Sequence, residues 1–249
     1  MKLSGNTVFI TGGTSGIGRS LAEALHKRGN QVIISGRRKG HLAEVTKANP
    51  GMQSLELNVA DPASIASAAK RLIAEYPKLN VLINNAGIMH IDDAAGAIDE
   101  AVLVSTVTTN LLGPIRMTSA LIEHLKKQPA ATVINVSSGL AFVPLAITAV
   151  YSATKAALHS YTQSVRYKLK GTSVRVLELI PPWVQTDLLN SKDEPRAMPL
   201  AAFIEEAVTV LGTDAEEVLV ERVKMLRNNP GPNEFVFVAQ FNDMIASAH

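Results

Sequence analysis

Short apolar runs alternate along this chain with longer segments in which apolar residues recur every three or four positions. The runs have the length of strands, are rich in Val, Ile and Leu, and lie at residues 6–11, 31–35, 54–59, 80–87, 131–138 and 173–180, with a seventh near 216–223. The longer segments follow a helical period at residues 16–29, 39–48, 60–77, 98–127 and 151–170. Strands that alternate with helices predict right-handed βαβ units and a parallel sheet covered on both faces.

The chain is expected to form one domain. Its 249 residues are 47% hydrophobic and 18% charged, which is ample for a large core, and no Gly-, Ser- or Pro-rich linker divides them. The pattern therefore predicts an α/β fold with a single domain over residues 1–249. Its architecture would be a three-layer, doubly wound (Rossmann) parallel sheet of about seven strands.

Residues of unusual type gather where the predicted strands end. They lie at 12–18, 36–38, 84–88, 137–139 and 181–187. Because parallel sheets of this kind bind ligands at the carboxyl ends of their strands, all five segments are expected at one crevice.

The segment TGGTSGIG, residues 11–18, joins the first predicted strand to the first predicted helix. Its glycines allow a tight turn, bare backbone where a pyrophosphate approaches, and close packing of helix on strand. The phosphates are expected at the helix N-terminus. The alternative is an ordinary glycine-rich turn. The predicted dinucleotide-binding residues of this loop are Gly12, Thr14, Ser15, Gly16, Ile17 and Gly18.

The second predicted strand ends in Gly36, and three cations follow it. Dinucleotide sites usually place an acidic residue here, on the ribose 2′-hydroxyl. With glycine in that place a 2′-phosphate meets no repulsion, and Arg37, with Arg38 beside it, can offer a forked contact. These residues favour NADP(H) over NAD(H) as the cofactor. The alternative is that both arginines are solvated surface charges.

The segment YSATK places Tyr151 and Lys155 one turn apart on one face of a helix. A lysine ammonium about 6 Å from the phenol is expected to favour the phenolate by roughly two pKa units. Tyr151 then suits a proton donor whose pKa is lowered by Lys155. The alternative is a solvated helical pair. Ser137 and Ser138 end the fifth predicted strand, where a serine without a histidine base suits binding of a developing oxyanion.

With these motifs the sequence resembles the short-chain dehydrogenase/reductase family, in its compact single-domain subgroup. The resemblance rests on TGGTSGIG, on NNAG at residues 84–87, on Asn110 and Ser138, and on YSATK. The segment MPLAAFIEEAV and the C-terminal tail are similar to those of the DltE-type subset of the family.

The resemblance implies catalytic roles for four residues. Tyr151 would be the proton donor or acceptor, and Lys155 would lower its pKa and bind the nicotinamide ribose. Ser138 would hold the substrate oxygen, and Asn110 would order a water linked to Lys155.

The resemblance also implies cofactor contacts and an assembly. Asn85, Ala86 and Gly87 would line the adenine-ribose side of the cofactor. The family is usually dimeric or tetrameric through helices near residues 110–127 and 151–170, so a homodimer or homotetramer is expected.

Two motifs depart from the family pattern. Asn58-Val59 stands where the family commonly has Asp-Val, and an asparagine still donates and accepts toward adenine. Pro182 stands where the family has a glycine beside the nicotinamide, and proline has no amide donor. The other positions of that loop still match the cofactor site, namely Pro181, Val184 and Thr186.

The substrate side of the crevice is apolar. Residues 139–147 follow Ser138, and Leu140 and Trp183 are expected to line a pocket for an apolar or mixed small molecule. Trp183 is as readily a simple packing residue. Residues 187–212 are expected to form a lid over the site, and the phenylalanines of the tail, 226–249, to pack at a subunit interface.

Composition narrows the classes of partner. The formal net charge is +2 with both signs spread along the chain, which argues against nucleic acid or an acidic membrane. The chain has no cysteine, which excludes thiolate chemistry and fits a cytoplasmic protein. No apolar stretch approaches the roughly 20 residues needed to cross a bilayer. The six histidines are scattered, so no metal site is expected.

Together these features predict an NADP(H)-dependent oxidoreductase that interconverts a carbonyl and a secondary alcohol, with the proton supplied by Tyr151. The alternative is a non-catalytic NADP(H)-binding sensor or regulatory protein on the same fold. An epimerase or dehydratase of the extended relatives is a weaker hypothesis, because those chains are longer.

Overall fold

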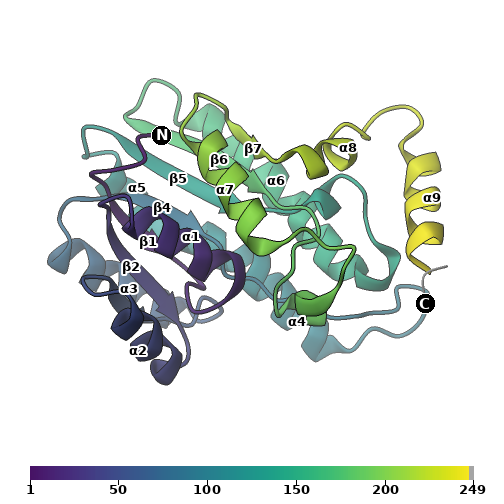
Figure 1. The fold of residues 1–249 in the computed structure, drawn as a ribbon, viewed down its shortest axis with the longest axis horizontal. Helices are drawn as coiled ribbons and strands as arrows, with labels where there is room; N and C mark the ends of the chain where they lie inside the picture. Colours follow the sequence, from purple (N-terminus) through teal and green to yellow (C-terminus); the bar gives the residue numbers. More distant parts are fainter. Residues whose placement is uncertain (247–249) are drawn as a thin grey trace.

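The computed structural model describes residues 1–246 and contains a seven-stranded parallel sheet between two layers of helices (Figure 1). The spatial order of the strands is β3-β2-β1-β4-β5-β6-β7. It reverses between β1 and β4, which is where doubly wound sheets bind ligands. The strands are β1 (Thr7–Ile10), β2 (Gln31–Gly36), β3 (Gln53–Glu56), β4 (Leu79–Asn84), β5 (Ala131–Val136), β6 (Val174–Ile180) and β7 (Glu217–Leu219). The predicted fold class is confirmed.

The helices divide between the two faces of the sheet. One apolar core joins the sheet to α1 (Gly16–His26), α2 (Lys39–Ala48) and α7 (Leu200–Leu211). A second core, on the opposite face, joins it to α3 (Pro62–Glu75), α5 (Gly113–Leu125) and α6 (Ala149–Lys168). Alternate strand residues serve alternate cores: Val8 and Ile10 belong to the first, and Phe9 to the second. Burial on both faces explains why the strands are almost continuously apolar.

Helix ends follow the local signals in most places. Asp61 caps α3 by accepting a hydrogen bond from Ala63 N at 2.8 Å, with Pro62 in the first turn, as predicted. The helix predicted over 98–127 is divided into α4 (Glu100–Val107), a π-helical turn (Thr108–Leu112) and α5. Such turns recur at functional sites, because they displace one residue from the regular helix.

The predicted lid divides into two unlike parts. Residues 200–211 form α7, whose Phe203, Ala207 and Leu211 are buried in the first core. A helix with that much buried apolar surface belongs to the body of the fold. The hypothesis of a lid therefore concerns residues 187–199, which include a 3₁₀ segment (Leu188–Asp193).

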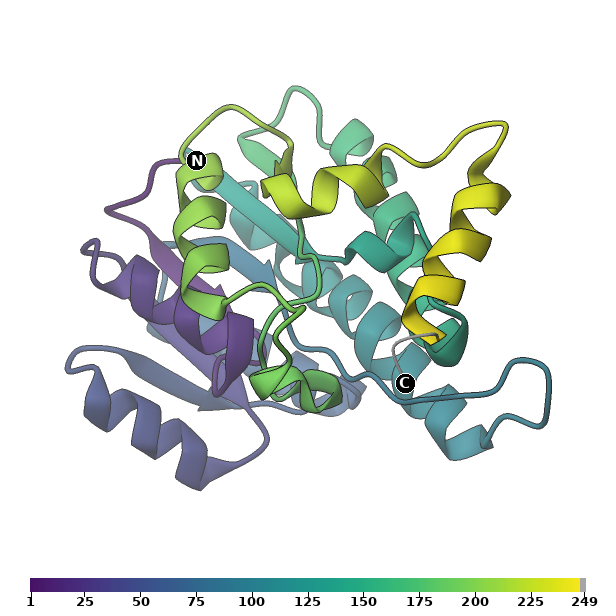
Figure 2. The ribbon, with the colours of Figure 1, turned by 45° about the vertical axis from the view of Figure 1, so that its right-hand side comes forward.

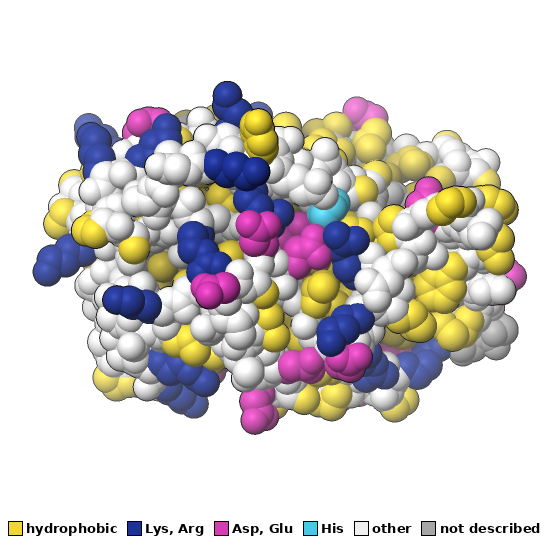
Figure 3. Space-filling model, turned by 90° about the horizontal axis from the view of Figure 1, so that it is seen from above, with side chains coloured by type: hydrophobic (Ala, Val, Ile, Leu, Met, Phe, Trp, Pro, Cys, Tyr) yellow, Lys and Arg dark blue, Asp and Glu magenta, His cyan; other side chains and the backbone are white. Residues whose placement is uncertain are grey.

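The C-terminal region extends to one end of the molecule. After α8 (Lys224–Arg227), helix α9 (Glu234–Ala246) lies beyond the helical layers, in yellow in Figures 1 and 2. Asn242 attaches it to the segment after Ser138, accepting from Ala146 N at 2.5 Å and donating to Pro144 O at 3.0 Å. Hydrophobic side chains gather at this end (Figure 3), and Phe235 is 69% exposed. The last three residues of the predicted tail, 247–249, lie outside the described part of the chain.

Among residues 1–246, no helix combines the length and the apolar character that crossing a bilayer requires.

Candidate active site

The glycine-rich loop after β1 is tied to the end of β4. Asn85 Nδ2 donates to Thr11 O at 3.0 Å and to Gly12 O at 3.1 Å. In return, Thr11 Oγ1 accepts from the amides of Asn85 and Ala86 at 3.0 and 3.1 Å. These four bonds hold two of the predicted cofactor segments together at the switch point. The role of Thr11 was not foreseen, since a threonine at a strand end has no distinctive pattern.

Two positions of the loop leave no room for a side chain. Gly12 has a φ of +69°, and a Cβ there would lie 2.8 Å from Ala86 Cα. A Cβ on Gly18 would lie 2.2 Å from Gly12 O. The loop can therefore pack against β4 and α1 only with bare backbone at both positions.

The start of α1 is open to an anion. Ser15 is the N-cap residue, its side chain makes no capping bond, and the first turn holds no acidic residue. Gly16 has a φ of +52° and lies beside Thr186, since a Cβ there would be 3.4 Å from the Thr186 side chain. Amides at an uncapped helix start suit a pyrophosphate. Ile17, in the same turn, packs against the first core.

The cationic segment after β2 lies against the glycine loop. A Cβ on Gly36 would lie 3.0 Å from Thr14 Cγ2. Lys39 is paired with Glu56 at 3.1 Å. Arg37 and Arg38 are exposed, and neither has an ion pair or side-chain hydrogen bond within residues 1–246. Two of the three cations are thus free to meet an anionic ligand.

Asn58 and Val59 lie in the loop after β3, since that strand ends at Glu56 and not at residue 59 as expected. Asn58 Oδ1 accepts from Ala60 N at 3.1 Å, so its oxygen shapes the loop. Val59 packs beside Gly113, where a Cβ would lie 3.0 Å from Val59 O.

Tyr151, Ser138 and Lys155 come together where β5 ends and α6 begins. Ser138 makes a hydrogen bond with the Tyr151 hydroxyl, and its Oγ accepts from Leu140 N at 3.1 Å. Lys155 Nζ lies 5.5 Å from the centre of the Tyr151 ring and donates to Val136 O at 2.8 Å. Tyr151 is 6% exposed and Lys155 is 4% exposed, so neither belongs to a solvated helical pair.

The expected decrease in the Tyr151 pKa is wrong for the protein alone. Burial raises the pKa of Tyr151 to about 12, and the hydrogen bond with Ser138 only partly offsets this increase. Burial also lowers the pKa of Lys155 to about 8, which the charge of Glu178 partly opposes. The phenol is therefore protonated at neutral pH, which suits a group that donates a proton.

Asn110 and Gly87 lie beside the lysine. Asn110 Oδ1 accepts from Ile88 N at 2.9 Å, and its Nδ2 donates to Ile88 O at 2.8 Å. A Cβ on Gly87 would lie 3.4 Å from Asn110 Oδ1 and 3.8 Å from Lys155 Nζ. The π-helical turn that carries Asn110 thus fastens the segment after β4 beside Lys155. Gly87 thus lies beside Lys155, whereas the family resemblance implies a place on the adenine-ribose side.

The start of α6 is held by a carboxylate outside the helix. Asp92 accepts from the amides of Ala149 and Val150, each at 3.0 Å. This bond pair fixes the turn immediately before Tyr151. The contact bridges 57 and 58 positions along the chain, so local sequence patterns could not indicate it.

The loop after β6 follows a defined path despite Pro182. Pro181 O accepts from Gly139 N at 2.9 Å, which joins this loop to the segment after Ser138. Val184 is 4% exposed and pairs in a β-bridge with Met198. With Thr186 beside Gly16, the loop connects the glycine turn to the segment that follows Ser138.

Of the predicted substrate residues Ser138, Leu140 and Trp183, only Leu140 lines the apolar groove beside α9. Leu140 lines a groove of about 410 Å³ together with residues of the 144–149 segment, α6 and α9. Phe142 and Val143 are buried in the fold, so only part of the 139–147 run can face a ligand. Trp183 is 36% exposed and its Nε1 donates to Ser191 Oγ at 2.7 Å, which ties it to residues 187–199.

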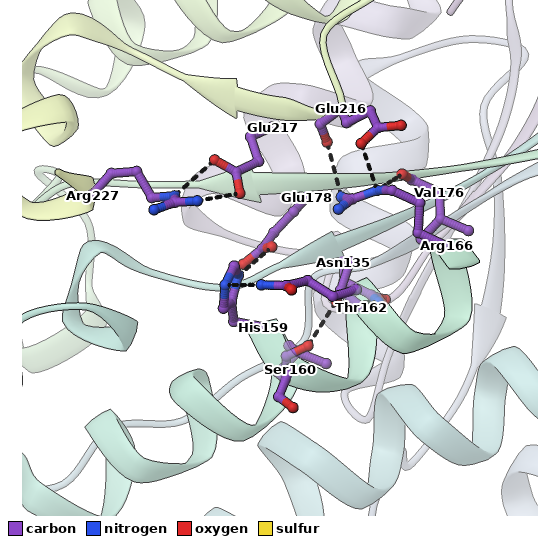
Figure 4. A network of polar contacts seen from close by, with 12 residues as sticks. Asn135, His159, Ser160, Thr162, Arg166, Val176, Glu178, Glu216, Glu217 and Arg227 are labelled. Atoms are coloured by element: carbon purple, nitrogen blue, oxygen red, sulfur yellow. Dashed lines mark hydrogen bonds and ion pairs between the residues drawn. The ribbon is translucent and has the colours of Figure 1, made fainter. Parts of the chain in front are cut away.

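A row of polar side chains near Lys155 was missed from the sequence (Figure 4). Its central member is Glu178, on β6, which is 0% exposed and bonded to His159 Nδ1 at 2.7 Å. One signal could have revealed it: Glu178 is an acidic residue inside the otherwise apolar run VLELI.

Comparison with known proteins agrees with this geometry. A family model described as short chain dehydrogenase matches residues 6–197. The chain is 40% identical to the Uncharacterized oxidoreductase DltE of Bacillus subtilis (strain 168) over 234 residues, which cover 92% of this chain and 93% of that protein. The chain therefore belongs to the short-chain dehydrogenase/reductase family of oxidoreductases. Within it, the chain falls in the DltE-type subset, as the sequence predicted.

Solved structures of this fold hold nicotinamide cofactors. A short chain dehydrogenase from Burkholderia cenocepacia J2315 in complex with NADP matches with a TM-score of 0.85 and 27% identity, covering 96% of this chain and 98% of that one. The 3-ketoacyl-(acyl-carrier-protein) reductase from Brucella melitensis complexed with NADH matches with a TM-score of 0.78 and 27% identity, covering 86% and 93%. A nicotinamide cofactor is therefore supported. One of these two neighbours holds NADP and the other holds NADH.

Proposed function

We propose that the protein is an NADP(H)-dependent oxidoreductase that interconverts a carbonyl and a secondary alcohol. The observation that carries the proposal is the buried group of Tyr151, Ser138 and Lys155 beside an open helix start. A protonated phenol, a hydroxyl bonded to it and a lysine within 5.5 Å of its ring supply what protonation of a carbonyl oxygen requires.

The protein's own residues have separate tasks in this reaction. The nicotinamide exchanges the hydride when it is bound. Tyr151 donates its proton to the substrate oxygen, and Ser138 donates a hydrogen bond to the same oxygen as charge develops. The Lys155 ammonium stabilises the phenolate that results. Asn110 holds the loop beside Lys155. The proton that Tyr151 gives up is replaced from water through Lys155.

The preference for NADP(H) is proposed from the end of β2. Gly36 provides no carboxylate to repel a 2′-phosphate, and the side chains of Arg37 and Arg38 have no ion pair or hydrogen bond within residues 1–246. The pyrophosphate would lie at the start of α1, and Val184 and Thr186 would hold the carboxamide. Gly87 would then line the nicotinamide-ribose side, next to Lys155.

The substrate is proposed to be an apolar or mixed small molecule. The apolar groove beside Leu140 and the exposed ring of Trp183 support this choice. We also propose that the chain acts in the cytoplasm as a homodimer or homotetramer. Light scattering at several concentrations measures the assembly directly.

The catalytic assignment is tested with Tyr151→Phe. Because general acid catalysis contributes about 10²–10⁴-fold, turnover with NADPH and a carbonyl panel should fall at least 100-fold, with NADPH binding retained. The matched control is Tyr161→Phe, ten positions along the same helix, which should keep parental turnover. Parental turnover in Tyr151→Phe would show that the assignment is wrong. A parental protein that binds NADPH tightly but oxidises none with any carbonyl would instead support the sensor alternative.

The cofactor choice is tested by titrating NADPH and NADH separately into the parental protein and Arg37→Ala. A charged hydrogen bond contributes about 1.5–3 kcal/mol, so Arg37→Ala should weaken NADPH binding at least tenfold and leave NADH binding unchanged. Lys39→Ala is the control, because Lys39 is already paired with Glu56. Equal parental affinity for the two cofactors would contradict the proposal.

A further inference from the structure

Glu178 is a buried carboxylate on β6, the strand next to the edge strand β7. It is 0% exposed, and within residues 1–246 its Oε1 atom has no hydrogen-bond partner. Its Oε2 atom lies 2.7 Å from Nδ1 of His159, on α6. A buried carboxylate is costly unless its charge is compensated, so its retention in an apolar strand requires a physical explanation.

Glu178 belongs to a polar row that crosses four neighbouring strands at one register. Asn84 pairs with Asn135, Asn135 with Glu178, and Glu178 with Glu217. Asn84 Nδ2 donates to Asn135 Oδ1 at 2.8 Å, and Asn135 Nδ2 donates to Thr162 Oγ1 at 2.9 Å. Arg227 binds both oxygens of Glu217, at 2.8 and 3.0 Å (Figure 4). Glu178 is therefore the one carboxylate of the row that no arginine neutralises.

Two elements, α6 and the sheet, place Lys155 near Glu178. Along α6, Lys155 precedes His159, the partner of Glu178, by one helical turn. Across the sheet, the Lys155 ammonium binds Val136 O at 2.8 Å. Val136 follows Asn135, which is the cross-strand neighbour of Glu178, and adjacent strands are about 4.8 Å apart. The carboxylate and the ammonium thus share a buried region in which charges interact strongly.

We propose that Glu178 is a positioning residue for Lys155: its buried charge keeps the lysine an ammonium, and His159 holds the carboxylate in place. The inference rests on the function proposed above, in which the ammonium stabilises the Tyr151 phenolate. The charge of Glu178 opposes the decrease that burial causes in the Lys155 pKa, in agreement with the geometry.

The other charges around Glu178 do not replace this role. The groups that face it are His159 and Lys155 from α6, Glu217 from β7 and Arg227 from α8. Arg227 and Glu217 neutralise each other. Donor atoms of His159, Glu178 and Glu217 lie within 4.8 Å of one another, but Arg227 already occupies both Glu217 oxygens, so these atoms do not form a free cation site.

The test is a direct titration of Lys155 in the full chain without substrate. Lysines are labelled with ¹³C at the ε-carbon, and Lys155→Arg identifies the signal by its loss. In Glu178→Gln the midpoint of the Lys155 titration should fall by roughly one pH unit, because one buried negative charge is removed. In Glu178→Asp, which keeps the charge, it should stay near the parental value.

This pair of variants separates charge from packing. A merely structural role would make the shorter aspartate at least as disruptive as the isosteric glutamine, whereas the proposal expects only the glutamine to move the midpoint. Glu216→Gln, an exposed neighbour of Glu217 paired with Arg166, is the control and should leave the midpoint unchanged. If Glu178→Gln does not fold, Glu178→Leu removes the charge with an apolar side chain of similar size. An unchanged midpoint in the folded variant would overturn the proposal.

A second measurement connects the charge to turnover. With NADPH and a working carbonyl, the pH above which kcat falls should move to lower pH in Glu178→Gln by the same interval as the NMR midpoint, and should not move in Glu178→Asp. If Glu178→Gln shifts the NMR midpoint but the parental protein turns over no carbonyl, the coupling between Glu178 and Lys155 stands and the proposed function is rejected. If the parental protein is active but Glu178→Gln shifts neither the NMR midpoint nor the pH profile of kcat, only the coupling between Glu178 and Lys155 is rejected.

Discussion

Gly12 offers a test of how tightly the glycine loop is packed. Its φ of +69° is strained for any residue with a side chain, and a Cβ there would lie 2.8 Å from Ala86 Cα. Gly12→Ala therefore adds two separate costs, one from backbone conformation and one from contact with the backbone of the loop after β4.

Two other glycines isolate these costs. Gly29 has a φ of +82° and no atom within 4 Å of its hypothetical Cβ, so Gly29→Ala measures conformation alone, about 1–2 kcal/mol. Gly18 is not in the positive-φ region, but its Cβ would lie 2.2 Å from Gly12 O. Gly18→Ala measures overpacking alone, about 1–3 kcal/mol. Gly12→Ala should combine the two and cost about 2–5 kcal/mol.

The assay is equilibrium unfolding in urea of the protein without cofactor, with the free energy of unfolding extrapolated to water. The slope with denaturant should be equal in all four proteins, because the same surface is exposed on unfolding. If Gly12→Ala were no less stable than Gly29→Ala, the close approach between the glycine loop and Ala86 would be refuted. The explanation of why this loop requires glycine would then fail with it.

Two further substitutions have expected effects on stability. Lys155→Met should raise the free energy of unfolding at pH 7 by about 2 kcal/mol. Burial lowers the Lys155 pKa from 10.5 to about 8, so methionine removes the cost of burying an ammonium, and loss of the lysine's hydrogen bond offsets part of this gain. Between pH 8 and 10.5 the unfolded parental chain binds more protons, so parental stability rises and the difference closes; urea unfolding at pH 7 and 10 measures this, and an equal gain at both would contradict it. The exposed Lys168→Met is the control. Asp92→Ala should cost about 1–2 kcal/mol by removing the acceptor of two helix amides, whereas Asp93→Ala, which loses one exposed loop contact, should cost less in the same assay.

Local patterns predicted the parts of the fold that depend on neighbours in the chain. The glycine turn, the cap at Asp61 and the helix over 39–48 were recognisable because spacing and residue type determine them within a few positions. The strand ends coincided at one edge because parallel topology requires it. The same reasoning found the residues that now surround Tyr151.

The remaining features depend on contacts between distant segments. The π-helical turn at Asn110 has the composition of an ordinary helix, so only its bonds to Ile88 distinguish it. The Tyr151 pKa was expected to fall because a charge nearby was considered and the extent of burial was not. Residues 200–211 have the apolar content of either a lid or a core helix, and their packing against α1 decides between the two.

The polar row across β4, β5, β6 and β7 has a consequence for how the sheet assembles. Side chains along a strand alternate between the two faces, so sliding any one of these strands by a single position would move its polar member into the apolar core on the opposite side. Asn84, Asn135, Glu178 and Glu217 meet only when all four strands are aligned as observed. In strands whose other residues are mostly interchangeable Val, Ile and Leu, these four residues reject misaligned pairings, and the alignment they enforce is the one that brings Val136 O to Lys155.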